Sequence, residues 1–348
     1  MERILVTGGA GFIGSHFVRC LLRQHPEYQV TNIDKLTYAG NRDNLRDVED
    51  DPRYRFVQGD ICDAALVDEV VAQANAVVNL AAETHVDRSL LDAGAFIQTD
   101  VYGTYVLLCA ARRHGVQRFL QVSTDEVYGE VPEGRFSRET DALRPRSPYA
   151  ASKAGGDMHC LAFFAAYGLP VVVSRGVNTL GPNQHPEKFV PLFITNALQG
   201  QPLPLYGDGR QVRDWLFVED HCEALDLLLH QGEPGQAYNI GGGNQRPNVR
   251  VAEAIVDLLD KPRDLIRRVP DRPGHDRRYA LDWSKLRALG WSPGHSFEEA
   301  LAKTVAWYRE NEEWWRRARA GAYQEYYQRQ YGWRLEAGAA AAREEGQG

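Results

Sequence analysis

The chain has 348 residues, a formal net charge of −7 at pH 7 and 43% hydrophobic residues. This composition is typical of a globular protein with one large or two fused domains, and an acidic balance without a basic block argues against binding to nucleic-acid backbones. No apolar run approaches the roughly 20 residues that span a bilayer. The N-terminus continues directly into a predicted strand, so we expect neither a membrane anchor nor a signal peptide.

The five cysteines lie far apart and form no CxxC pair; they are Cys20, Cys62, Cys109, Cys160 and Cys222. An odd, scattered set indicates small buried hydrophobic side chains in a reducing cytoplasm. No His/Cys pair has the spacing of metal ligands, so we expect no metal site.

A glycine-rich loop follows the first predicted strand. Ile4-Leu5-Val6 is a short apolar run typical of a buried parallel strand, and a helical pattern begins at Ser15. Between them, Gly8, Gly11 and Gly14 let the chain turn tightly, approach a pyrophosphate closely and pack helix on strand. The free N–H groups at the helix N-terminus favour phosphate binding, so this segment predicts a dinucleotide site.

Asp34 ends the second predicted strand, Val30–Asp34, roughly 20 residues after the glycine loop. A carboxylate at this position accepts hydrogen bonds from the ribose hydroxyls. It also repels a 2′-phosphate, so the sequence favours NAD over NADP.

Strands and helices alternate through residues 1–175. Further strands are expected at 56–61, 76–82, 118–123 and 171–175, and helices at 99–114 and 149–167. Repeated strand–helix units predict an α/β fold, a Rossmann-type doubly wound parallel sheet that binds NAD, with later segments crossing back to it.

The remainder of the chain has a different composition. Residues 176–316 contain glycine-rich breaks and apolar patterns that predict helices near 187–199, 219–231, 249–260 and 296–317, so we expect a smaller C-terminal substrate-binding lobe. Residues 317–335 form an aromatic-rich extension that we expect to pack on the domain. Residues 336–348 are rich in Ala, Gly and Glu without an apolar period, which predicts a disordered tail.

Tyr149 and Lys153 are four residues apart, so on a helix they share one face. A nearby ammonium favours the phenolate, and we therefore expect the pKa of Tyr149 to lie below its usual value near 10. Tyr149 is then a base toward a substrate hydroxyl, and Lys153 also holds the cofactor ribose. Taken alone, such a pair is common by chance on a protein surface.

Asp125 and Glu126 lie just past a strand's carboxyl end, where ligands bind in open α/β sheets. Adjacent side chains diverge unless the backbone bends, and the alternative interpretation is a solvated turn or an acid pair favoured by a helix dipole. The functional interpretation gives one carboxyl the role of acid and the other that of base, which requires environments that separate their pKa values.

Residues 1–316 resemble the extended short-chain dehydrogenase/reductase family, in particular its nucleotide-sugar dehydratase branch that acts on dTDP-glucose. The segments that carry the resemblance are Thr7–Ser15, Asp34–Gly40, Ala81–Ser89, Ser123–Gly129, Pro186–Lys188, Tyr206–Gly209, Val212–Trp215 and Arg272–Tyr279. The Thr124-Asp125-Glu126 triplet is what separates these dehydratases from their relatives. The chain departs from the family pattern at Gly176, Leu180 and Asn183, which touch the substrate loop.

The resemblance implies a dehydration that begins with an oxidation. Tyr149 takes the proton of the glucose 4-hydroxyl while hydride passes from C4 to NAD, and Thr124 hydrogen-bonds the 4-oxygen. Glu126 then removes the C5 proton, Asp125 protonates the departing 6-hydroxyl, the hydride returns to C6, and C5 is reprotonated. NAD is thus retained, not consumed.

The resemblance also implies the remaining site residues. Besides the three glycines, Asp34, Tyr149 and Lys153, the cofactor residues are Phe12, Ile13, Lys35, Leu36, Thr37, Asp60, Ile61, Leu80, Ala81, Ala82, Thr99 and Thr179. Besides Thr124, the substrate residues are Thr84, Asn178, Lys188, Arg213, Asn248, Arg272 and His275. Cationic donors such as Lys188 and Arg213 suit a diphosphate.

Two other functions stay open at this point: a nucleotide-sugar epimerase or decarboxylase on the same scaffold, and an NAD-sensing binding protein without catalysis. Relatives pair two helices from each subunit, so the helices at 99–114 and 150–167, which carry apolar faces, lead us to expect a homodimer.

Overall fold

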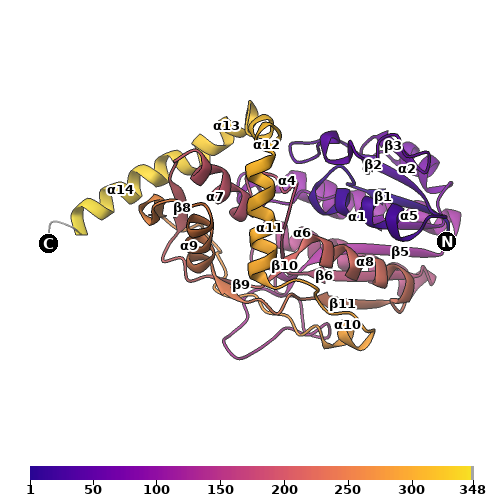
Figure 1. Ribbon diagram of the computed structural model, residues 1–348. Coiled ribbons are helices and arrows are strands. Elements are labelled where there is room, and N and C mark those ends of the chain that lie inside the picture. Colours follow the sequence, from indigo (N-terminus) through magenta and orange to yellow (C-terminus); the bar gives the residue numbers. More distant parts are fainter. Residues whose placement is uncertain (346–348) are drawn as a thin grey trace.

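The central sheet has seven strands, all parallel, in the order β11-β6-β5-β4-β1-β2-β3 (Figure 1). Its strands are β1 (Arg3–Thr7), β2 (Gln29–Asp34), β3 (Tyr54–Gln58), β4 (Ala76–Asn79), β5 (Arg118–Thr124), β6 (Val171–Gly176) and β11 (Gln236–Ile240). This confirms the predicted Rossmann-type sheet. The strand order reverses between β1 and β4, where open α/β sheets bind their ligands. The computed structural model describes residues 1–345.

The α-helices are α1 (Phe12–Gln24), α2 (Ala64–Val71), α3 (Val86–Ser89), α4 (Ala93–Phe96), α5 (Thr104–His114), α6 (Pro148–Tyr167), α7 (Phe189–Leu198), α8 (Val218–Gln231), α9 (Asn248–Leu258), α10 (Ser284–Ala288), α11 (Phe297–Glu310), α12 (Glu312–Ala318), α13 (Ala322–Tyr327) and α14 (Trp333–Glu345). Short 3₁₀ turns are η1 (Arg42–Leu45), η3 (Asp125–Tyr128) and η4 (Arg263–Leu265). Two π-helical turns are η2 (Ile97–Gly103) and η5 (Gln328–Gly332). None of these described helices is both long and apolar enough to cross a membrane.

Helices cover the sheet on both faces, and alternate side chains of each strand point to opposite faces. Neighbouring residues of one strand therefore belong to different cores. Ile4 and Val6 of β1 join the core that contains α1, α8 and much of the second lobe. Leu5 joins the core that contains α2, α5 and α6. A strand covered in this way is a continuous apolar run, as the sequence of β1 shows.

The second lobe is built from three small strand pairs and the helices α7, α9 and α11. The pairs are β7 (Asn178–Leu180) with β10 (Trp215–Phe217), β9 (Val212–Arg213) with β12 (Arg246–Pro247), and β8 (Leu203–Tyr206) with β13 (Ile266–Val269). Strand β11 returns from this half of the chain to the edge of the central sheet. The division of the chain at residues 175 and 316 stays a prediction.

Two expected elements differ from those in the structure. The helix expected at 296–317 is divided at Asn311, whose backbone leaves the helical region with φ −114° and ψ 46°. The tail expected to be disordered from residue 336 is instead helical as far as Glu345, in α14. It packs so closely on β13 that a Cβ at Gly338 would overlap the carbonyl oxygen of Arg268. Residues 346–348 lie outside the described residues.

The aromatic side chains of the C-terminal extension are largely buried. Trp315, just before the extension, is 1% exposed, and its indole N–H donates to the carbonyl oxygen of Tyr308 at 2.8 Å. Tyr323, Tyr326 and Tyr331 are also buried. Figure 1 shows α12 to α14 leading away from α11 along the second lobe.

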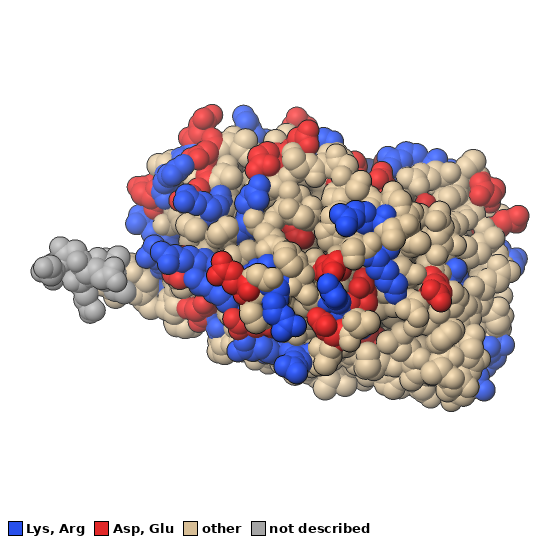
Figure 2. Space-filling view, turned by 90° about the horizontal axis from the view of Figure 1, so that it is seen from below, with Lys and Arg blue, Asp and Glu red and all other residues tan. Residues whose placement is uncertain are grey.

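Figure 2 shows charged side chains of both signs interspersed over much of one face, beside a broad area almost free of them.

Candidate active site

The glycine loop joins β1 to α1 at the carboxyl edge of the sheet. Gly8 has φ +69°, and a Cβ there would lie 2.7 Å from Cα of Ala81, so only glycine fits. A Cβ on Gly14 would lie 2.2 Å from the carbonyl oxygen of Gly8. These close approaches leave the first amides of α1 open toward the cavity, as a pyrophosphate requires.

Asp34 ties the end of β2 to this loop. Its carboxylate accepts hydrogen bonds from N–H of Leu36 at 2.8 Å and of Ala10 at 2.9 Å. Burial raises the pKa of Asp34, and the two backbone bonds oppose that rise. Nearby, Lys35 forms an ion pair of 2.7 Å with Asp60.

One cavity runs from the glycine loop to the end of β6, and most of the predicted site residues line it. It is lined by Gly8, Gly11, Phe12, Ile13, Gly14, Asp34, Lys35, Thr37, Asp60, Ile61, Leu80, Ala81, Ala82, Thr84, Thr99, Thr124, Asp125, Glu126, Tyr149, Lys153, Asn178, Thr179 and Lys188, among others. Five predicted residues do not line it: Leu36, Arg213, Asn248, Arg272 and His275. The cofactor and catalytic candidates therefore converge on one space.

Thr124 and Asp125 stand where β5 passes into the 3₁₀ turn η3. This turn is the backbone bend that adjacent acidic side chains need to share a site, and Thr124 caps it by accepting from N–H of Glu126 at 3.3 Å. The Thr124 hydroxyl also lies 3.2 Å from Oδ1 of Asp125, while Oδ2 has no partner among the described residues. Burial, with Glu126 beside it, raises the pKa of Asp125 to about 8.

Glu126 is half-buried, and its surroundings include several cations. Burial raises the pKa of Glu126, whereas Arg272, Arg213 and Lys188 oppose the rise in that order. Two of these three cations, Arg213 and Arg272, lie outside the cavity lining but act on the carboxylate within it.

Tyr149 and Lys153 lie on the first turns of α6, which begins after a Ser147 cap with Pro148 in the first turn. Lys153 is buried, and its ammonium donates to the carbonyl oxygen of Val122 at 2.8 Å. The pKa of Tyr149 is raised well above its usual value, first by burial and then by Glu126 and Asp100. The expectation that the pKa of Tyr149 lies below its usual value is thus wrong for the protein alone, because burial and carboxyl groups dominate.

The remaining predicted substrate residues are held in fixed contacts. Arg272 forms a 2.7 Å ion pair with the buried Asp87. Arg213 donates to the carbonyl oxygen of Asp276 at 2.9 Å. His275 bonds Asp271 at 2.6 Å. The ammonium of Lys188 bonds the carbonyl oxygen of Thr84.

Several lining residues were not predicted from the sequence. They are Ile33, Ala39, Gly40, Gly59, Glu83, Val122, Ser123, Gly176, Val177, Gln184, His185 and His221. Five of them, namely Ile33, Gly59, Glu83, Ser123 and Val177, are immediate neighbours of predicted residues, so the positions of those predicted residues were the available signal. His221 is different, since it lies on α8 far from any predicted motif.

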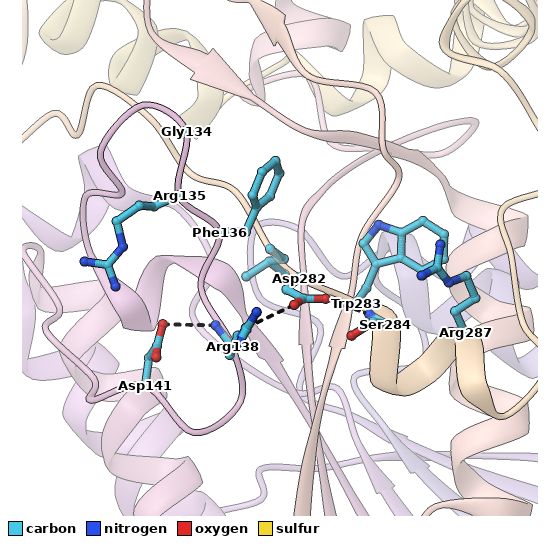
Figure 3. Close-up of a pocket in the computed structure, with 10 residues that line it drawn as sticks. Gly134, Arg135, Phe136, Arg138, Asp141, Asp282, Trp283, Ser284 and Arg287 are labelled. Carbon is cyan, nitrogen blue, oxygen red and sulfur yellow. Dashed lines mark hydrogen bonds and ion pairs between the residues drawn. The ribbon is translucent and has the colours of Figure 1, made fainter.

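Two features lie away from this cavity. A more open hollow of about 560 Å³ is bordered by Arg135, Phe136 and Arg138 on one side and Trp283 and Arg287 on the other, and it contains none of the predicted residues (Figure 3). Separately, His25, Asp226 and His230 bring their ligand-type atoms within 4.8 Å of one another. Hydrogen bonds already join His25 to the carboxylate of Asp226 and His230 to its backbone oxygen, at 2.9 and 2.7 Å.

The model of the family described as GDP-mannose 4,6 dehydratase matches residues 5–304. The chain belongs to this family. A dTDP-glucose 4,6-dehydratase of Streptomyces niveus is 53% identical over 90% of this chain and 94% of its own.

Solved structures give the same result. DesIV, a dTDP-glucose 4,6-dehydratase from Streptomyces venezuelae with NAD and TYD bound, has a TM-score of 0.89 and 50% identity, covering 91% of this chain and all of its own. The Thermus thermophilus UDP-glucose 4-epimerase complex with NAD has a TM-score of 0.83 and 35% identity, covering 89% of this chain and 100% of that chain. The scaffold is therefore shared with epimerases.

Proposed function

We propose that the protein is an NAD-dependent dTDP-glucose 4,6-dehydratase, a hydro-lyase that forms dTDP-4-keto-6-deoxyglucose and water. One observation carries the proposal: Asp125, Glu126 and Tyr149 line the same cavity as the glycine loop. An enzyme that only oxidises an alcohol needs the Tyr149–Lys153 pair and neither carboxyl group. A buried acid and a second carboxyl beside it suit the removal of water after the oxidation.

NAD fits the residues that line the cavity. Gly8 and Gly14 permit the backbone approach that a pyrophosphate needs. Asp34 stands at the end of β2 for the adenosine ribose, and its negative charge disfavours a 2′-phosphate. Asp60 and Ile61 would border the adenine, and Lys153 would hold the other ribose. When bound, NAD supplies a hydride acceptor for C4 and later a donor for C6.

In the oxidation half, Tyr149 accepts the proton of the 4-hydroxyl. The Thr124 hydroxyl hydrogen-bonds the 4-oxygen and stabilises the charge that develops on it. Burial holds Tyr149 protonated in the protein alone, and a positive nicotinamide ring acts in the opposite direction. Lys153 adds a second positive charge on the same helix face.

In the elimination half, the 4-keto group acidifies the C5 proton, which Glu126 removes. Asp125 then protonates the departing 6-hydroxyl. Because its pKa is raised to about 8, Asp125 carries this proton at neutral pH. Two adjacent carboxyls thus take opposite roles through their surroundings.

The nucleotide end needs positive charge for its diphosphate. Lys188, Arg213 and Arg272 supply it, and all three act electrostatically on Glu126. The polar residues Thr84, Asn178, Asn248 and His275 would hold the remaining sugar and nucleotide groups.

The deciding experiment incubates the purified protein, without added NAD, with dTDP-glucose and separately with UDP-glucose. We expect a 4-keto-6-deoxy product from dTDP-glucose, seen as alkali-induced absorbance and as loss of one water by mass. An epimer of the sugar instead, or no turnover while NAD is bound, contradicts the proposal. If activity survives in both Asp125→Asn and Glu126→Gln, the elimination roles are wrong.

We further propose that the enzyme is a homodimer. An outward face formed by η2, α5 and α6 exposes large apolar side chains, namely Ile97, Tyr102, Tyr105, Met158, Phe164 and Tyr167. Exposed apolar patches of this kind are typical of association surfaces. Light scattering at micromolar concentration is expected to give twice the mass of the chain, and Tyr105→Glu with Tyr167→Glu to give the monomer. A monomeric wild type contradicts the proposal.

We also propose a cytoplasmic location, on the grounds that all five cysteines are unpaired in the structure, as in a reducing compartment. Cell fractionation with a compartment marker tests it. Recovery of the enzyme with secreted or membrane fractions would contradict it.

A further inference from the structure

His221 lines the cavity at the end of β6, although no predicted motif contains it. Its side chain is buried at 2% exposure. Gly176, in register with Thr124 of the neighbouring strand, stands directly before the ring. A Cβ at residue 176 would lie 2.7 Å from Cε1 and 2.9 Å from Nε2 of His221. Glycine at this position therefore leaves room between Nε2 and the cavity.

The hydrogen bonds around the ring fix its tautomer. Nδ1 of His221 lies 2.8 Å from Oγ1 of Thr179, and the same Oγ1 lies 3.3 Å from the carbonyl oxygen of Val177. The hydroxyl has one proton, so both bonds form together only if it donates to Val177 and accepts from Nδ1–H. Nε2 then carries a lone pair, and it has no partner among the described residues.

The ring stays neutral at physiological pH, because burial lowers the pKa of His221 to about 4. A neutral imidazole with Nδ1–H offers only an acceptor at Nε2. A buried acceptor without a partner costs free energy, so the site favours a ligand with an N–H or O–H group at this point.

We propose that Nε2 of His221 accepts a hydrogen bond from the carboxamide N–H of the bound nicotinamide and so fixes the direction in which that amide points. The inference rests on the NAD site of the proposed function. Tyr149 and Thr124 line the same cavity, and Thr124 is in register with Gly176, so the place where the nicotinamide has to meet the sugar lies beside His221. Among the groups of NAD that reach this end, the carboxamide –NH₂ is the N–H donor.

The test uses two cofactors that differ in this donor alone: NAD, and 3-acetylpyridine adenine dinucleotide, in which methyl replaces the amino group. The holoenzyme is exchanged against a mixture of the two, and the bound ratio is measured by chromatography. We expect wild type to prefer NAD about three- to tenfold, as one neutral hydrogen bond predicts. His221→Leu should lose this preference, and His221→Gln, which keeps an acceptor oxygen, should retain part of it.

Gly176→Ala tests the same contact without changing His221, because the added Cβ occupies the space between Nε2 of His221 and the cavity. We expect it to reduce the preference without removing His221. An unchanged preference in His221→Leu overturns the proposal.

A measurement on wild type alone avoids dependence on the folding of any variant. In protein labelled with ¹⁵N-histidine, the Nε2 resonance of His221 should shift between the NAD and acetylpyridine forms. Identical resonances overturn the proposal. Neither readout involves sugar turnover, so a failure of the dehydratase assay is distinguishable from a failure of this contact.

Discussion

The hydroxyl of Tyr279 lies 3.4 Å from Oε2 of Glu126. It lies closer, at 2.8 Å, to Oδ2 of Asp276, and the guanidinium of Arg213 covers the ring at 4.2 Å from its centroid. The hydroxyl of Tyr279 thus lies between the carboxyl groups of Glu126 and Asp276, and the guanidinium of Arg213 packs on its ring. Since a carboxylate base must point at one proton of the substrate, the tyrosine is placed to hold Glu126 in position.

Replacing Tyr279 by Phe removes the hydroxyl and keeps the ring. We expect the turnover number to fall several-fold, because the single hydroxyl proton is shared with Asp276 and the contact with Glu126 is worth less than the about 1.5–3 kcal/mol of a full hydrogen bond to a charged group. Exchange of the C5 proton with solvent should slow in parallel, while NAD content stays unchanged. Tyr28→Phe, at the far side of the protein beside His230, is the control and should leave both rates unaltered. Equal rates in Tyr279→Phe and wild type rule out this role.

Asp125 predicts how the elimination depends on pH. Its pKa in the folded protein, about 8, lies above the usual value, so the protonated acid is present below that pH and disappears as pH rises through it. We therefore expect the rate of water loss to fall above about pH 8. In Asp125→Asn this alkaline limb should vanish along with most of the activity. A wild-type rate that stays flat to pH 10 is incompatible with Asp125 as the acid.

Gly14 predicts a specific loss of cofactor. A methyl group on this residue meets backbone, at 2.2 Å from the carbonyl oxygen of Gly8, so the loop has to move away from its position. Gly14→Ala should purify with little NAD, measured by its absorbance after acid extraction. Gly94→Ala is the matched control, because the contact there is a side-chain oxygen of Asp92 at 3.3 Å. Full NAD content in Gly14→Ala would show that the loop does not bind the pyrophosphate.

The buried ion pair between Arg175 and Asp157 predicts a large effect on stability. Nε of Arg175 lies 2.9 Å from Oδ2 of Asp157, and both side chains are essentially inaccessible to solvent. Asp157→Asn leaves a buried guanidinium without its counter-charge, which costs about 3–5 kcal/mol. We expect a clear drop in the midpoint of urea unfolding. Asp257→Asn, which breaks the exposed pair with Arg263, should change the midpoint far less.

The N-terminal half was predictable because its signals are local. Gly8, Gly11 and Gly14 lie close together in the chain, and Asp34 ends the next strand. The alternation of strands and helices directly predicts the parallel sheet. Asp125, Glu126, Tyr149 and Lys153 were found for the same reason, since each lies at a strand end or on the next helix.

The rest depends on contacts between distant residues. Tyr279 reaches Glu126 across 153 positions, and no spacing in the sequence indicates it. The helix expected at 296–317 is broken at Asn311, and α14, which packs closely on β13 at Gly338, is helical where composition favoured disorder. The pKa of Tyr149 was predicted in the wrong direction, since the sequence shows the neighbouring Lys153 but neither the burial of the ring nor the approach of Asp100.

The π-helical turn η2 carries residues of two different surfaces. Thr99 lines the cofactor cavity, whereas Ile97 and Tyr102 are exposed on the opposite side of the same turn. In the proposed dimer, the second subunit and the cofactor would therefore contact one stretch of seven residues. If dimerisation raises the affinity for NAD by some factor, then bound NAD raises the affinity between the subunits by the same factor. If the proposed dimer forms in this way, a subunit that holds NAD more tightly as a dimer also holds its partner more tightly when NAD is bound.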